Sequence, residues 1–261
     1  MALALALLFS LAIGLALGLL GGGGSILTVP ILVYALGVEP KEAIATSLLV
    51  VGITSLAAMI PHARAGAVRF RTGLLFGATA MVGAYGAGRV AHFVPASVLL
   101  LLFSAMMVAT ALAMMRPRSG ASPEIEAKEL PIGKVILEGL VVGGVTGLVG
   151  AGGGFLVVPA LVLLGGLPMR AAVGTSLLVI AMKSFAGFSG YLGHVAIDLR
   201  LAALVSGAAV VGSLFGGRFA GRLSQDALRR GFGWFVLAMG VGMFATQAPD
   251  VFGAGCALPT R

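Results

Sequence analysis

Long apolar runs that contain almost no charge dominate this sequence and restrict the fold to one that is stable in lipid. Of the 261 residues, 59% are apolar and 10% are charged, whereas a soluble domain carries about a quarter charged residues. A helical crossing needs roughly 20 residues, and lipid requires each segment to satisfy its own backbone groups. The pattern therefore predicts an all-α polytopic membrane protein. The apolar runs lie near 1–20, 25–36, 42–61, 73–91, 95–115, 133–150, 154–166, 171–192, 200–220 and 228–246.

The two halves of the chain repeat the same motif in the same register. Without any gap, Gly18–Pro30 (GLLGGGGSILTVP) aligns with Gly147–Pro159 (GLVGAGGGFLVVP). The difference in residue number between Gly18 and Gly147, which we call the repeat offset, also places Ala45–Val50 (ATSLLV) on Gly174–Val179 (GTSLLV). A register that holds over such a span indicates an internal repeat.

We therefore divide the chain into two membrane repeats. The first covers residues 1–115 and the second covers residues 133–247, with a linker at 116–132 and a short C-terminal tail at 248–261. Because each repeat has five segments, an odd number, the second repeat enters the membrane from the opposite side. The sequence thus predicts two inverted five-segment repeats, whose short Gly-interrupted helices meet near the membrane midplane.

Basic residues fall unevenly on the two sides that this topology creates. Twelve lie on one side and four on the other. Because cytoplasmic loops are enriched in Lys and Arg, we expect the linker in the cytoplasm and both termini on the periplasmic or extracellular side. The larger group is Arg64, Arg69, Arg71, Arg116, Arg118, Lys128, Lys134, Arg170, Arg218, Arg222, Arg229 and Arg230. The smaller group is Lys41, Arg89, Arg200 and Arg261.

A glycine-rich break interrupts the apolar run at matching positions of the two repeats, at Gly21–Gly24 and Gly150–Gly154. A short apolar segment begins directly after each break, at Ser25 and at Gly154. Its first N–H groups and positive dipole end favour an anion, and matching breaks are typical of a transporter binding site. The alternative is that the glycines only allow helices to pack closely.

Hydroxyl and ammonium groups complete a candidate substrate site. The Thr46-Ser47 pair recurs as Thr175-Ser176 and offers donors to an oxyanion, unless the hydroxyls bond back to carbonyls one turn earlier. Lys183 is the one cation deep inside an apolar run, which favours a role as counter-charge over snorkelling. The candidate substrate-binding residues are Gly22, Gly23, Gly24, Ser25, Thr46, Ser47, Gly152, Gly153, Gly154, Thr175, Ser176 and Lys183.

Other functions receive less support from these residues. A passive anion channel would use the same glycine-rich helix starts, so both carrier and channel stay open. An intramembrane enzyme would need Ser176 as nucleophile and Lys183 as base, but two helical turns separate their Cα atoms by about 10 Å. Cys256 is the single cysteine, which excludes intrachain disulfides and multi-cysteine metal sites. We expect no catalytic residue, cofactor or metal.

The two glycine-rich motifs resemble those of a known family. GLLGGGGSILTVPIL and GLVGAGGGFLVVPAL, each followed by (A/G)TSLL, are similar to the sulfite exporter TauE/SafE family, also called the toluene sulfonate uptake permeases, over nearly the whole chain. The resemblance implies transport of sulfite, a sulfonate or another small sulfur-containing anion across the bacterial inner membrane. It also implies that the repeated glycines and Thr-Ser pairs carry the function.

The expected partners are a small anionic substrate and the lipid bilayer. A second copy of the chain is a candidate partner in a homodimer. The net charge of +8 is spread over single or paired basic residues between apolar segments, without the basic patch that nucleic-acid binding needs. No nucleic-acid partner is therefore expected.

The predicted topology is tested by cysteine labelling at position 119. In a Cys256→Ser background, Ser119→Cys lies in the cytoplasmic linker, so an impermeant thiol reagent should fail to label it in intact cells. A reporter fused to the C-terminus should respond as a periplasmic one. Efficient labelling of position 119 before the cells are opened contradicts the orientation.

Overall fold

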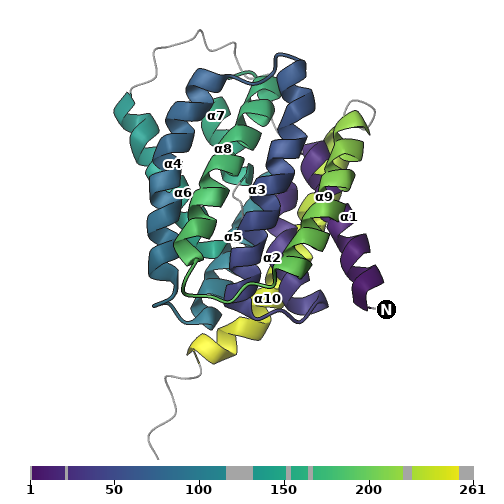
Figure 1. The fold of residues 1–261 in the computed structure, drawn as a ribbon, viewed down its shortest axis with the longest axis vertical. Coiled ribbons are helices and arrows are strands. Elements are labelled where there is room, and N and C mark those ends of the chain that lie inside the picture. Colours follow the sequence, from purple (N-terminus) through teal and green to yellow (C-terminus); the bar gives the residue numbers. More distant parts are fainter. Residues whose placement is uncertain are drawn as a thin grey trace, which may run out of the picture.

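The computed structural model of the chain is a bundle of helices (Figure 1). No strand occurs among the residues that it describes, which confirms the predicted all-α class. The predicted linker lies almost entirely outside the described residues, as do the last residues of the tail. The described residues are 2–20, 23–115, 132–150, 154–163, 167–219 and 225–252.

Each apolar run corresponds to a helical segment, and α10 extends furthest beyond its predicted end. The first half holds α1 (Ala2–Leu20), η1 (Gly23–Leu27), α2 (Thr28–Pro30), η2 (Ile31–Ala35), α3 (Pro40–Arg64), α4 (Phe70–Ala91) and α5 (Ala96–Met115). The second half holds α6 (Ile132–Val149), α7 (Gly154–Leu163), α8 (Met169–Tyr191), α9 (Leu199–Phe219) and α10 (Gln225–Phe252).

Proline and glycine mark the ends of the two central helices, α3 and α8. Pro40 is the first residue of α3 and Pro168 caps the start of α8, where the missing N–H costs nothing. Gly66 follows α3 with a φ of 68°, and Gly193 follows α8 with a φ of 86°. Only glycine adopts these left-handed turns without strain, so the local sequence sets where both helices stop.

Four helices of the described chain are long and apolar enough to cross a bilayer, and they are the third and fourth segments of each half. Their spans are Pro40–Arg64, Phe70–Ala91, Ala171–Tyr191 and Leu199–Gly216. The second segments are much shorter. The ten residues of α7 rise about 15 Å, half of the roughly 30 Å hydrocarbon core. The described residues of α7 are therefore too few to cross the core alone.

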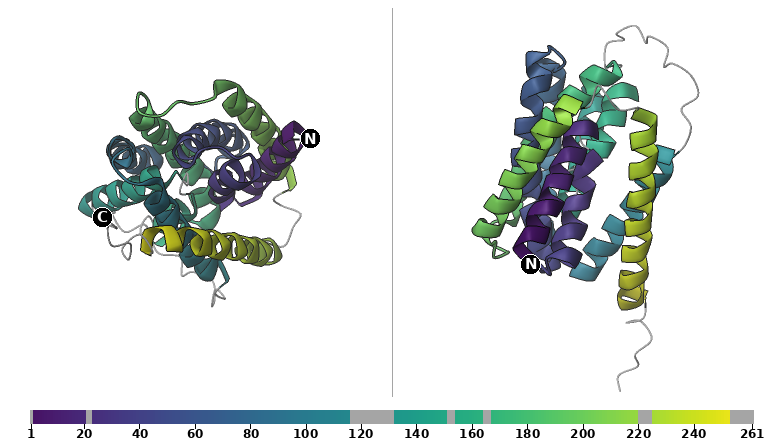
Figure 2. Two further views of the ribbon diagram at one scale, coloured as in Figure 1. Left: turned by 90° about the horizontal axis from the view of Figure 1, so that it is seen from below. Right: turned by 90° about the vertical axis from the view of Figure 1, so that its right-hand side faces the viewer.

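The pair α3 and α8 forms the centre of the bundle (Figure 2). A methyl group on Gly52 of α3 would lie 3.2 Å from the Phe185 ring, and one on Gly187 would lie 3.3 Å from the Leu48 side chain. Residue numbers therefore fall along α3 as they rise along α8, and the two helices run antiparallel. Outside this pair, α4 packs on α8 and α9 packs on α3, while α1 pairs with α9, α6 with α4 and α5 with α10.

Glycines let the outer helices touch backbone to backbone. A methyl group on Gly83 of α4 would overlap the carbonyl oxygen of Leu140 in α6. Gly212 of α9, which the repeat offset places on Gly83, has the same contact with Leu11 of α1. Small residues that allow such close approach are a main source of helix association in lipid, so these glycines hold α6 and α1 in place.

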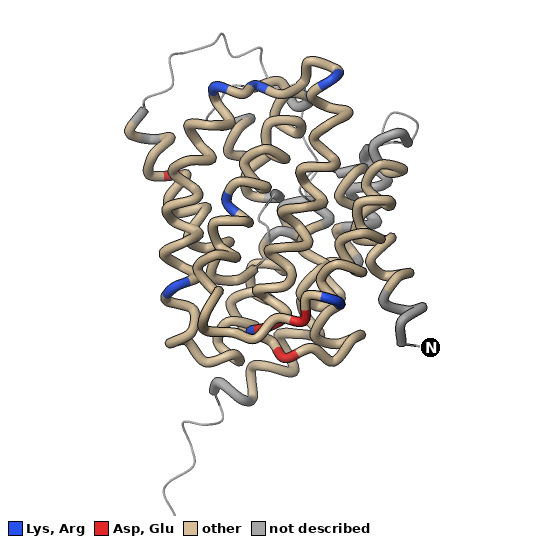
Figure 3. Tube along the Cα trace, in the orientation of Figure 1, with Lys and Arg blue, Asp and Glu red and all other residues tan. Residues whose placement is uncertain are grey.

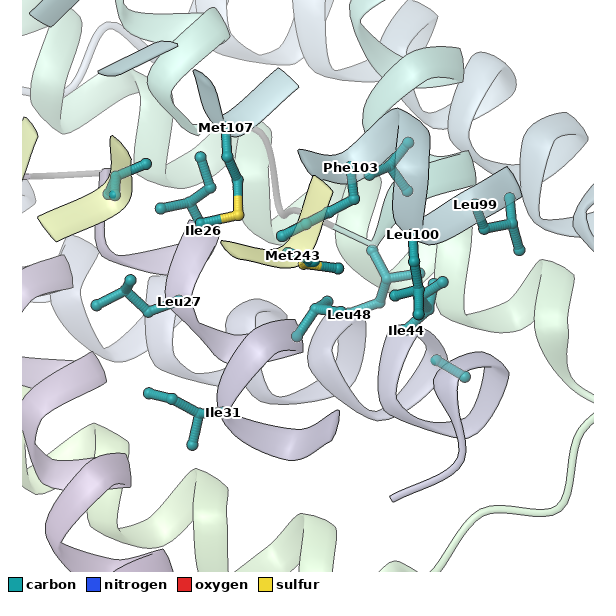
Figure 4. Packing of buried hydrophobic residues seen from close by; sticks show 14 of the residues in the cluster. Ile26, Leu27, Ile31, Ile44, Leu48, Leu99, Leu100, Phe103, Met107 and Met243 are labelled. Atoms are coloured by element: carbon teal, nitrogen blue, oxygen red, sulfur yellow. The ribbon is translucent and has the colours of Figure 1, made fainter. Parts of the chain in front are cut away.

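The largest apolar cluster fixes the first short segment, as Figure 4 shows. Ile26 and Leu27 of η1 belong to the same buried cluster as Leu48 of α3, Phe103 of α5 and Met243 of α10. The 3₁₀ turn is therefore packed among helices from both halves of the chain.

Charged residues gather at the two ends of the bundle, and a basic position also lies midway along it (Figure 3). Arg64 and Arg69 flank the connection from α3 to α4 at one end. At the other end the Lys41 ammonium donates to the His92 carbonyl, 2.9 Å away. The start of α1 and the end of α10 both lie at the Lys41 end (Figure 1). Which end faces the cytoplasm stays a prediction.

The glycine contacts predict a large difference between two neighbouring substitutions in α4. Gly83→Ala should lower the free energy of unfolding by about 1–3 kcal/mol, because the new methyl group must push α6 away. A methyl group on Gly86 would meet no neighbouring atom within 4 Å, so Gly86→Ala is the matched control and should leave the melting temperature in detergent unchanged or slightly raised. Equal melting temperatures for the two variants would contradict the packing.

Candidate substrate site

The two short segments that follow the glycine-rich breaks contact each other, through η1 and α7. Gly23 opens the 3₁₀ turn of η1 and Gly154 is the first residue of α7. Gly21, Gly22 and the stretch 151–153 lie outside the described residues. The segments that follow the two breaks therefore lie side by side, and their position near the membrane midplane stays a prediction.

The first short segment is not the single regular helix that the apolar run predicted. It passes from a 3₁₀ turn through three α-helical residues into the π turn of η2. Pro30 ends the α-helical part and has no N–H to donate, and glycines precede the 3₁₀ turn, so the local sequence favours irregular geometry. The side chains from Ser25 to Leu32 are nevertheless all buried. A helix dipole sums over peptide units that are aligned in a regular helix, so it is larger for α7 than for this irregular segment.

Two hydroxyl groups hold the end of α6 just before the second break. The Ser47 hydroxyl lies 2.8 Å from the Ile44 carbonyl oxygen and 2.6 Å from that of Gly150. The Tyr191 hydroxyl donates to the Leu148 carbonyl at 2.8 Å. Carbonyls at a helix end have no partner within the helix, so α3 and α8 supply the donors that this buried helix end needs.

The remaining Thr-Ser hydroxyls are also buried, and two of them bond to backbone. Thr175 accepts a hydrogen bond from the Arg69 amide at 2.9 Å, and Ser176 donates to the Val173 carbonyl at 2.8 Å. Thr46 is buried as well. The structure therefore gives Ser47 and Ser176 the back-bonded geometry that was the alternative to lining a site. In this conformation their protons are directed at carbonyls.

Lys183 is the only buried charged residue among those whose side-chain burial the structure describes, with 1% of its surface exposed. Its ammonium group donates to the Thr146 hydroxyl of α6, which in turn donates to the Val142 carbonyl at 2.6 Å. Thr54 takes the equivalent position in the first repeat and donates to the Val50 carbonyl at 2.6 Å. Ser176 and Lys183 thus have separate partners, and the buried cation exists in one repeat only.

Sequence reasoning missed four other buried hydroxyls, of which Ser206 is the fourth beside the three named next. Within the described chain, those of Thr28, Ser55 and Ser184 have no hydrogen-bond partner, although most buried polar groups in proteins are paired. Ser55 and Ser184 are related by the repeat offset. Extending the aligned Thr-Ser motif by two further helical turns would have found this pair.

The titratable side chains at the Lys41 end of the bundle contact one another and the backbone of nearby loops. The rings of His92 and His194 stack with centroids 4.2 Å apart, and the Glu42 carboxylate accepts a hydrogen bond from the Asp198 amide at 3.0 Å. Among the described residues, no group of three or more His, Cys, Asp or Glu side chains is placed to hold a metal ion. These contacts tie loops together at the edge of the bundle.

Comparisons with known proteins agree on a membrane transporter. The family model described as "Sulfite exporter TauE/SafE" matches residues 6–243. A "Probable membrane transporter protein" of Xylella fastidiosa (strain Temecula1) is 34% identical over 235 residues, 88% of this chain and 90% of the relative. "Probable membrane transporter protein MJ0441" of Methanocaldococcus jannaschii is 31% identical over 190 residues, covering 69% of this chain and 70% of that protein. No solved structure matches.

The contacts at the end of α6 predict that the Tyr191 hydroxyl stabilises the second break. Tyr191→Phe leaves the Leu148 carbonyl without its donor, which should cost about 1 kcal/mol of unfolding free energy. Tyr85, which is exposed, provides the matched control, since Tyr85→Phe should be neutral. Thermal unfolding in detergent measures both, and an unchanged melting temperature for Tyr191→Phe would show that the bond contributes nothing.

Proposed function

The chain belongs to the sulfite exporter TauE/SafE family of membrane transporters, and we propose that it is a secondary transporter for a small sulfur-containing anion in the bacterial inner membrane. Sulfite, a sulfonate or a related organosulfur anion is the substrate class. The family description and the transporter names of the relatives support this class, and the site adds a physical reason for an anion.

The proposal includes an architecture of two inverted repeats. The repeat offset relates Gly83 to Gly212 and Leu11 to Leu140. The contact of Gly83 with Leu140 is therefore equivalent to that of Gly212 with Leu11. By the same offset α4 corresponds to α9 and α6 to α1, so the packed pair α4–α6 is equivalent to the packed pair α9–α1. In the pairs α3–α8 and α5–α10, each helix packs against its own equivalent. Such an exchange is what a two-fold axis between equivalent units produces. In transporters of this kind the substrate binds near the midplane, at the interface between the repeats.

The burial of Lys183 is the main observation in favour of an anionic substrate. A buried ammonium group in the middle of a membrane-spanning helix is costly, and such groups mark candidate functional sites. The Thr146 hydroxyl solvates it but brings no negative charge, and no carboxylate is buried among the residues whose burial the structure describes. A substrate anion would supply the missing charge. The glycine-rich segments around Gly24 and Gly154 would then offer backbone N–H groups from the two repeats.

The Thr-Ser pairs have a supporting role in this proposal. Ser47 of the first repeat holds the Gly150 carbonyl at the edge of the second break, and Thr175 of the second repeat binds the loop that joins α3 to α4. Each pair therefore connects its own helix to the other repeat. Movement of one repeat against the other would change these contacts, which makes them candidates for donors to the anion during transport.

A carrier and a passive channel are distinguished by uptake into vesicles. The purified full-length chain, reconstituted in liposomes, should accumulate sulfite, sulfoacetate or thiosulfate when a proton or sodium gradient is imposed, and accumulation should stop when the gradient is dissipated. Flux that only equalises the anion concentrations would identify a channel, and chemical turnover of the anion would identify an enzyme.

The same assay tests Lys183. A buried charge-assisted contact contributes about 1.5–3 kcal/mol, so Lys183→Ala should raise the concentration for half-maximal uptake roughly ten- to a hundredfold. Lys183→Arg should restore uptake only in part, because the guanidinium is larger and forked. Lys41→Ala, which removes a lysine at the end of the bundle, is the control. A folded Lys183→Ala protein with unchanged uptake would show that the buried cation is not part of the site.

A further inference from the structure

Two buried serines at equivalent positions of the repeats have hydroxyls that the fold leaves unused. Ser55 and Ser184 are each 0% exposed, and neither hydroxyl has a hydrogen-bond partner among the described residues. A buried polar group without a partner destabilises the protein and calls for an explanation. That both repeats retain one at the same position points to a shared role.

Both serines lie on the helix faces by which α3 and α8 pack together. Ser55 follows Gly52 by three residues and Leu48 by seven, which is one face of α3, and both of these residues contact α8. Ser184 follows Ile180 by four residues and precedes Gly187 by three on α8. Ile180 belongs to an apolar cluster shared with α3, and Gly187 touches Leu48. The two hydroxyls therefore belong to the same interface.

Along the helix axes, the two serines also lie close to the residues through which α3 and α8 contact each other. Gly52 lies beside Phe185, and Leu48 lies beside Gly187. In an antiparallel pair, this register places the residues around Ser184 opposite those just before Ser55. Lys183 directly precedes Ser184 in the chain. The one buried cation of the described chain is thus one residue along α8 from this interface, with its ammonium group bonded to Thr146 of α6.

This combination selects an anion with several acceptor oxygens. The Lys183 ammonium makes the surroundings positive, which disfavours a metal cation, and no buried carboxylate compensates among the residues of known burial. A neutral molecule would gain nothing from that charge. An oxyanion gains both the attraction and the hydrogen bonds, and bonds from neutral donors to a charged acceptor are stronger than those between neutral groups.

We propose that Ser55 and Ser184 donate hydrogen bonds to oxygens of the transported anion, one hydroxyl from each repeat. The proposal rests on the proposed function, and it places the anion between α3 and α8, beside Lys183. Because both hydroxyls are fully buried, the anion reaches them only when α3 and α8 move apart. The contacts that must give way include those of the Phe185 and Leu48 side chains, which can change rotamer without unfolding a helix.

The test combines sulfite titration by calorimetry with thermal unfolding of the full-length chain in detergent. Ser55→Ala and Ser184→Ala should each weaken sulfite binding roughly tenfold. The melting temperature without sulfite should stay the same or rise, because an unused buried hydroxyl has been removed. The increase in melting temperature on adding sulfite should shrink in step with the lost affinity.

Ser206 of α9 is the matched control. It is also buried and has no hydrogen-bond partner in the described chain, but Gly77 occupies the equivalent position of the first repeat. Ser206→Ala should leave the sulfite affinity unchanged. A loss of affinity in Ser206→Ala equal to that in the two serine variants would mean that any buried hydroxyl has this effect, and would overturn the proposal.

The remaining outcomes separate this proposal from the proposed function. Unchanged sulfite affinity in both Ser55→Ala and Ser184→Ala, with Lys183→Ala still weakened, overturns the serine pair alone and leaves the anion transporter intact. A lower melting temperature without sulfite would show that the serine is structural, and would overturn the proposal at that position. If the wild-type chain binds none of sulfite, sulfoacetate and thiosulfate, both proposals fail.

Discussion

The antiparallel packing of α3 against α8 is the contact on which the rest of the bundle depends. Lipid provides no hydrophobic drive between helices, so association rests on close packing and on polar groups that find partners. Gly52 and Gly187 admit the Phe185 ring and the Leu48 side chain at this contact. The outer helices then attach to the central pair, α4 to α8 and α9 to α3, and carry α6 and α1 through their own glycines.

Polar groups in the centre fall into two kinds with different consequences. The hydroxyls of Ser47 and Tyr191 satisfy carbonyls at the end of α6, and thereby stabilise a helix that must stop inside the bundle. The hydroxyls of Ser55 and Ser184 satisfy nothing in this conformation. This pair of unused donors, one residue along α8 from Lys183, is the observation on which the proposed anion site rests.

The two repeats differ at the buried cation, which matters for the anion binding that we propose. Lys183 and Thr146 of the second repeat correspond to Thr54 and Leu17 of the first, so a single ammonium group lies close to the contact between two nearly equivalent units. Two such groups would repel each other in a low-dielectric interior. One cation can attract a small anion while donors from both repeats surround it, and those donors need not be equivalent.

The sequence by itself determined the helices and their repetition, because an apolar run in lipid must satisfy its own backbone groups and the repeat offset is visible in the residues themselves. It also singled out Lys183, since a charge inside such a run is rare. Only the tertiary structure decided the partners: Ser47 of α3 meets the distant Gly150, and Ser55 and Ser184 meet none among the described residues. Periodicity defines which face of a helix a hydroxyl occupies. The distant segment packed against that face decides whether the hydroxyl is satisfied.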